Sequence, residues 1–224
     1  MLFVHDVHAV MGERELEFED SVRGEYAPAI AADDDTRLLW YLNSTHGAGE
    51  AYKVVTITAV RDGAAWERLV ERLRRGDLSA WNSRAESMRY GLQSTLLIGL
   101  PSSPLVDVDL ASVPTEPQDH ALAVYREDTL DGPGLDGPLG AAPTTAADAD
   151  ADAVLTPAAT FRPAVDPGSR RVVLYRVAEP DRWTPVFGTD AGWDDWPGSL
   201  TPSLPPAVSG SSRILRTASW SPLP

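Results

Sequence analysis

The sequence contains no cysteine, and Lys53 is the only lysine among its 19 basic residues. Without cysteine the chain can form no disulfide, has no thiolate metal ligand and has no cysteine nucleophile. No apolar run approaches the ~20 residues of a membrane-spanning helix, and no basic segment opens the N-terminus. These absences lead us to expect a soluble cytoplasmic protein that has no membrane partner.

Positive charge is also scarce, because the 224 residues carry a formal net charge of −14. No Lys/Arg-rich run exists to neutralise phosphates, so we expect no nucleic-acid partner. The acidity itself is typical of a well-solvated surface. With 43% hydrophobic residues, the chain has enough apolar side chains for one large domain or two small ones.

What the sequence does contain is a weak internal repeat at an offset of 118 residues. Val54-Val55 returns as Val172-Val173, and Ser103-Pro104-Leu105 returns as Ser221-Pro222-Leu223. Between them, Ser94 returns as Ser212. A shared offset over such distant segments indicates two copies of one supersecondary unit.

Alternating and helical periodicities predict a β-α-β-β-α-β order for the first copy. Pro28 is expected to kink or end its first helix, and Asp62 is expected to cap the second. The expected strands are Leu2–Val10, Thr36–Asn43, Ala51–Val60 and Ser94–Leu100, and the expected helical segments are 14–31, 63–75 and Leu78–Tyr90.

The second copy keeps the strands but loses the helices. Its expected strands are Ala121–Glu127, Thr160–Val165, Arg171–Ala178 and Arg213–Trp220. Residues 130–159, with no aromatic and no Lys or Arg, are expected to form a mobile insertion. We therefore place one unit at 1–110, a linker at 111–119 and a second unit at 120–224.

This order resembles the ferredoxin-like dimeric α/β-barrel superfamily, which includes antibiotic-biosynthesis monooxygenases, EthD-like proteins and NIPSNAP proteins. The acidic and aromatic segment from Glu17 to Ile30 is similar to the first helix of NIPSNAP-like members. The resemblance implies an α+β fold of two tandem ferredoxin-like units that form an intrachain α/β-barrel. This chain departs from the superfamily in the eroded helices of its second unit. It also implies a site for a small hydrophobic molecule, and a monomer or homodimer.

Asp6 and His8 are the leading catalytic candidates. They share one face of the first expected strand, whereas His5 lies on the other face. A carboxylate two residues from an imidazole can tune its pKa, and His8 could then act as a general base. The alternative is a hydrogen-bonded strand histidine with no catalytic role. Since His5 and His8 point to opposite faces, a shared metal ion is not expected.

Other residues could bind a substrate in the first unit. Arg23 and Tyr26, one helical turn apart, could hold an enolate or phenolate oxygen; alternatively Arg23 pairs with Glu19. His46 lies in a glycine-containing loop, where it is either functional or solvated. The aromatic candidates for a pocket wall, for which plain core is the alternative, are Trp40, Tyr41, Tyr52, Trp66 and Trp81.

The sequence thus favours a small-molecule enzyme of natural-product metabolism that acts on an aromatic or polyketide-like intermediate. A monooxygenase or cyclase without a tightly held cofactor fits the resemblance best, with an imidazole base in a buried pocket. A non-catalytic binding or interaction protein of the same fold is the alternative. A third hypothesis is haem binding, with His5, His8 or His46 as the axial ligand.

Overall fold

The structure is a computed structural model that describes residues 1–45, 47, 50–133, 135, 155–165, 170–177 and 208–224. The chain forms two compact units. The first contains Met1–Leu97, Asp109–Leu122 and Leu215–Pro224, and the second contains Ile98–Val108 and Ala123–Ile214. This division differs from the expected repeat boundaries, because residues 109–122 and 215–224 pack with the first unit. The boundaries at 110 and 120 stay a prediction about the repeat.

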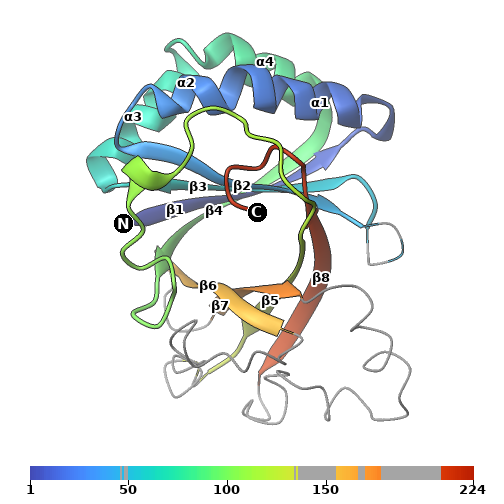
Figure 1. Ribbon diagram of the computed structural model, residues 1–224, viewed down its shortest axis with the longest axis vertical. Helices are drawn as coiled ribbons and strands as arrows, with labels where there is room; N and C mark the ends of the chain where they lie inside the picture. Colours follow the sequence, from blue (N-terminus) through green and yellow to red (C-terminus); the bar gives the residue numbers. More distant parts are fainter. Residues whose placement is uncertain (46, 48–49, 134, 136–154, 166–169, 178–207) are drawn as a thin grey trace. The chain divides into compact units, whose positions relative to one another are not determined.

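The first unit has the expected order of strands and helices. Its strands are β1 (Leu2–Val10), β2 (Thr36–Ser44), β3 (Lys53–Val60) and β4 (Arg89–Gly99), and its main helices are α1 (Glu15–Ser21), η2 (Val22–Tyr26), α2 (Ala27–Ala31), α3 (Gly63–Arg74) and α4 (Ser79–Ser87). The strand order is β4-β1-β3-β2, and Leu215–Thr217 of β8 pairs with the far side of β2. Helices α1–α4 all lie on one face of this sheet (Figure 1). Two short 3₁₀ turns, η1 (Gly12–Arg14) and η3 (Leu110–Ser112), complete the unit.

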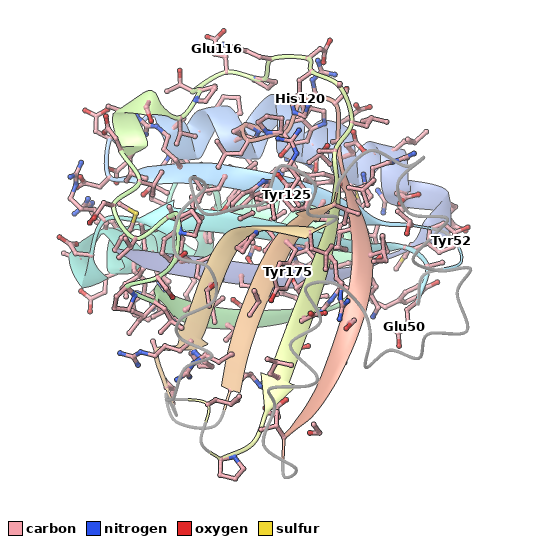
Figure 2. All side chains as sticks on the ribbon, turned by 60° about the horizontal axis from the view of Figure 1, so that its bottom comes forward. Glu50, Tyr52, Glu116, His120, Tyr125 and Tyr175 are labelled. Atoms are coloured by element: carbon pink, nitrogen blue, oxygen red, sulfur yellow. The ribbon has the colours of Figure 1, made fainter. Side chains whose placement is uncertain are left out.

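The second unit repeats the strand order without the helices. Its strands are β5 (Val124–Asp131), β6 (Leu155–Pro163), β7 (Arg170–Val177) and β8 (Ser209–Thr217). They are ordered β8-β5-β7-β6 and lie side by side in that order (Figure 2). No helix occurs in the described part of this unit. The α+β class, the tandem ferredoxin-like order and the eroded second unit are therefore confirmed for the described chain.

The repeat extends to a local irregularity. In the first unit the pairing of β2 with β3 shifts between Leu38 and Trp40. In the second, the pairing of β6 with β7 shifts between Pro157 and Ala159. A β-bulge at the same point of both second strands supports a common ancestry of the units.

The bulges also correct the register of the sequence repeat. Val60 of β3 faces the start of β2, and Val177 of β7 faces the start of β6. Counted from these pairs, Thr56 corresponds to Val173, which is one residue away from the 118-residue offset. The offset located the equivalent strands correctly, since β3 and β7 each lie between the first and second strands of their units. Its pairing of Val54-Val55 with Val172-Val173 is out of register by one residue.

Several strand boundaries differ from expectation; β4 begins at Arg89 instead of Ser94, and β8 begins at Ser209 instead of Arg213. The two ends of the expected mobile insertion are ordered strands, because Leu130–Asp131 ends β5 and Leu155–Ala159 begins β6. Backbone pairing with β7 overrides the weak local propensity of these residues. The interior of that insertion, residues 136–154, lies outside the described residues. Within the described chain, no helix is long and apolar enough to cross a membrane.

Candidate functional site

A cavity of about 50 Å³ lies in the first unit, on the helix-covered side of its sheet. The strands supply its polar wall, with Asp6 and His8 from β1, Thr56 from β3 and Arg89 from β4. Tyr26 of η2 and Trp81 of α4 form much of the opposite wall. The volume suffices for a few water molecules, whereas drug-sized ligands occupy about 300–1,000 Å³. A larger molecule could therefore place only an edge in this cavity unless side chains moved.

The helical wall depends on a π-helical turn. Pro28 has no N–H to offer the carbonyl of Gly24, so the regular α-helical pattern cannot continue across it. The helix instead adopts a π-helical turn at η2, where the N–H of Ala27 donates to the carbonyl of Val22, five residues earlier. Tyr26, at the end of this turn, stacks on Trp81 with ring centroids 4.4 Å apart and planes inclined by 22°. Single π turns inside helices are often found at functional sites.

His8 is fully engaged by its neighbours. Its Nδ1 lies 2.8 Å from Nη1 of Arg89, and its Nε2 lies 3.2 Å from Oγ1 of Thr56. Because a guanidinium only donates hydrogen bonds, Nδ1 must be the acceptor and the proton must reside on Nε2, which donates to Thr56. Burial, followed by the nearby charges of Arg89 and His5, lowers the pKa of His8 from 6.5 to about 3. In this arrangement His8 is neutral and is hydrogen-bonded through both of its ring nitrogens.

Asp6 is the opposite case. It occupies the strand position that pairs with Thr56, and it lines the cavity. Its side chain hydrogen-bonds with Ser94, yet Oδ1 is buried without a hydrogen-bond partner among the described residues. Burial raises the pKa of the Asp6 carboxyl, and the hydrogen bond from Ser94 and the charges of His5 and Arg89 only partly oppose that effect. An unsatisfied buried oxygen is costly and is a common mark of a functional carboxyl group.

Arg89 is the main residue that the sequence analysis missed. It was placed at the end of an expected helix, 78–90, but α4 ends at Ser87 and Arg89 begins β4. Only 8% of this side chain is exposed, and burial lowers its pKa despite the charges of Asp6 and Glu86. A buried arginine needs a hydrogen-bond acceptor, and here the acceptor is His8. The two residues are brought together by tertiary packing, which their spacing in the sequence does not reveal.

The structure brings together four of the expected site residues: Asp6, His8, Tyr26 and Trp81. Arg23 is exposed and pairs with Asp119 at 3.3 Å, so neither the cavity nor the expected Glu19 contact holds it. His46 falls outside the described residues.

Three of the remaining aromatic candidates are core residues. Tyr41 packs against Phe18 and Trp220, and Trp66 lies half-buried against the same core. Trp40 pairs with Ile57 and so lies on the sheet face opposite Thr56. The bulge at Leu39 is the reason, because it interrupts the alternation that would otherwise put Leu38 and Trp40 on the same face of β2.

No family model and no curated protein matches the sequence. Solved structures match its fold over nearly the whole chain. One is a "putative monooxygenase" from Lactobacillus acidophilus, with a TM-score of 0.60, 10% identity, and coverage of 98% of this chain and 96% of that chain. Another is an anthrone oxidase-like protein, with a TM-score of 0.55, 11% identity, and coverage of 97% and 91%. A third is a "putative chlorite dismutase", with a TM-score of 0.52, 7% identity, and coverage of 98% and 96%.

These likenesses define the class of the fold. The chain is a two-unit α+β protein with the fold of these monooxygenase-like and chlorite dismutase-like structures, so the resemblance seen in the sequence is confirmed at the level of the fold. At 7–11% identity they show the fold and do not establish the reaction.

Proposed function

We propose that the cavity beside Asp6 is the catalytic centre of a small-molecule enzyme. The observation that supports this proposal is a buried oxygen of Asp6 that has no hydrogen-bond partner among the described residues. It belongs to a cavity that is also lined by the Arg89 guanidinium and by aromatic side chains. Such a group is suited to remove a proton from a weak carbon or oxygen acid. The substrate class is an aromatic or polyketide-like intermediate, and the enzyme belongs to natural-product metabolism as a cofactor-independent monooxygenase or a cyclase.

Both reactions start with the same step. Removal of a proton next to a carbonyl, or from a phenol, leaves an electron-rich anion. In the monooxygenase reaction this anion reduces dioxygen; one oxygen atom enters the product as a carbonyl and the other leaves as water. In the cyclase reaction the anion attacks a carbonyl carbon of the same molecule, and no oxidant is needed. The names of the structurally similar monooxygenase-like and anthrone oxidase-like proteins support the first reaction.

Haem does not fit at His8. Both ring nitrogens are already occupied, by Arg89 and Thr56, and the adjoining cavity of about 50 Å³ is far smaller than the site of a ligand of that size. His5 lies opposite Ile57 on the other face of the sheet and cannot reach this cavity. Within the described chain no three His, Asp or Glu side chains gather as a metal site.

A non-catalytic ligand-binding or interaction protein is the second candidate, and the small cavity volume favours it. Anthrone, an aromatic ketone with acidic CH₂ hydrogens, is a test substrate that distinguishes the enzyme from the non-catalytic binding protein. We expect the protein to accelerate dioxygen consumption and anthraquinone formation above the spontaneous rate. Arg89→Met should lose most of this acceleration, and Arg84→Met, an exposed arginine paired with Glu25, should retain it. Anthrone oxidation no faster than the spontaneous rate would contradict the monooxygenase.

A further inference from the structure

The acid–base partner in the cavity can be identified from its hydrogen bonds. A general base must present a free lone pair to its substrate. The Nδ1 lone pair of His8 is occupied by Arg89, and its Nε2 carries the proton donated to Thr56. The imidazole would have to lose a buried contact with a cation before it could accept a proton from any ligand.

Asp6 meets the requirement without rearrangement. Its Oδ1 is buried and has no hydrogen-bond partner among the described residues, while Ser94 holds the carboxyl from β4. Both Asp6 and Arg89 line the same cavity, and the positive charge of Arg89 favours the ionised form of Asp6.

Arg89 has donors to spare. The guanidinium carries five N–H groups, and the described residues use one of them, in the bond to His8. That bond fixes the guanidinium at the cavity wall, and Phe18 holds the His8 ring from the other side with centroids 5.0 Å apart. An oxygen anion entering the cavity would meet a preorganised cation in a poorly hydrated site.

Resting on the proposed function, we infer that Asp6 is the proton acceptor and that Arg89, oriented by His8, binds the oxygen anion that forms on the substrate. The substrate class is a phenol or an enolisable aromatic ketone. Its acidic edge enters the cavity, and its ring lies at the opening beside Leu92, an apolar side chain that is 43% exposed. His8 is a positioning residue in this arrangement.

The step balances without a further reactant. The substrate C–H or O–H bond breaks, the proton forms an O–H bond at Oδ1 of Asp6, and the electron pair stays on the substrate. The negative charge moves from Asp6 to the substrate oxygen, where Arg89 neutralises it. The protonated Asp6 then returns the proton in the second half of the reaction.

p-Nitrophenol tests the inference directly, because its anion absorbs visible light and its neutral form does not. The wild-type protein should bind p-nitrophenol as the phenolate, and the proton released from the phenol should move to Asp6. The infrared difference spectrum should then show the C=O stretch of a protonated carboxyl group. Asp6→Asn, whose amide mimics the protonated acid, should lose that stretch and bind the phenolate at least tenfold more tightly near neutral pH. Arg89→Met should weaken phenolate binding by tenfold or more.

His8→Asn and Glu86→Gln are the matched variants. Asn can still accept from Arg89, so His8→Asn should keep the carboxyl signal and weaken binding by no more than a few-fold. Glu86→Gln, which removes an exposed charge near Arg89, should behave as wild type. Persistence of the carboxyl signal in Asp6→Asn, or its loss in His8→Asn, would overturn the assignment, and failure of the wild type to bind the phenolate would overturn the substrate class. If p-nitrophenol behaves as expected but no aromatic ketone is turned over, the proposed function fails while the assignment of Asp6 stands.

Discussion

Asp6 in the first unit and Asp128 in the second hold the same position in the repeated sheet. Asp6 pairs with Thr56 of β3, and Asp128 pairs with Val173 of β7, the residue that corresponds to Thr56 when counted from the bulges. Each carboxyl also receives a hydrogen bond from a serine of the fourth strand, Ser94 or Ser212.

The two carboxyl groups differ in whether an arginine donates a hydrogen bond to them. Arg126 donates to Oδ1 of Asp128 at 2.7 Å, and Ser212 donates to the same oxygen at 2.6 Å. Val4 takes the place of Arg126 in the first unit, so Asp6 has no arginine on its own strand, and the nearby Arg89 donates to His8 instead. A buried carboxylate with a structural role needs a cation as its partner, whereas a carboxylate that accepts a proton needs an oxygen that can reach the substrate. This difference agrees with the proposed catalytic role of Asp6 and with a structural role of Asp128.

Breaking the pair in the second unit should have the largest effect. Arg126→Met leaves the Asp128 carboxylate buried without its cation, so the free energy of unfolding should fall by about 3–5 kcal/mol at neutral pH. Urea denaturation measures this loss. Adding Asp128→Asn to Arg126→Met should restore part of the stability, because the uncompensated charge is then gone. A loss that is equal in the single and double variants would mean that packing, and not charge, holds this site.

His8 should make the first unit sensitive to acid. The folded protein binds the His8 proton only near pH 3, whereas the unfolded chain binds it near 6.5. The stabilisation is therefore complete above pH 6.5 and is lost as the pH falls from 6.5 towards 3, by up to about 1.4 kcal/mol per pH unit. In His8→Asn this part of the slope should disappear when unfolding is followed by circular dichroism.

His120→Asn is the control for that slope, since His120 bonds to the carbonyl oxygens of Ala121 and Ser221 and not to a buried cation. It should leave the stability difference between pH 6.5 and pH 4 close to that of the wild type. An unchanged acid slope in His8→Asn would show that His8 is not held neutral in the folded protein.

Asp6→Asn should have the smallest effect on the free energy of unfolding. The change should be opposite in sign to that of Arg126→Met in the second unit. Because burial raises the pKa of Asp6, its ionisation costs stability above that pKa. The variant should match or exceed the wild type by about 1 kcal/mol at pH 7–8, and the difference should shrink as the pH falls and Asp6 is protonated. The thermal midpoint between pH 4 and 8 measures it. A large loss at pH 8 would mean that the charged carboxylate is structural, as in Asp128.

Much of this comparison was accessible from the sequence. Periodicity placed Asp6 and His8 on one strand face, and the repeated Ser94 and Ser212 anticipated the two equivalent fourth strands. Arg89 was missed because the helical pattern of Trp81, Ala85 and Met88 continues to the residue before it, with no sequence signal for the switch to β4. The sheet face on which Trp40 lies could not be derived from strand alternation, because a bulge has no reliable local signature.

The order of the elements follows from the sequence alone, since hydrophobic periodicity and turn residues act over a few positions along the chain. The face of β1 that carries Asp6 also follows from the sequence, because side chains alternate along a strand. In contrast, the nitrogen of His8 that holds the proton and the carboxyl oxygen of Asp6 that has no partner among the described residues are consequences of tertiary packing. Those properties depend on burial and on partners such as Arg89, 81 residues away in the chain, and no local pattern encodes them.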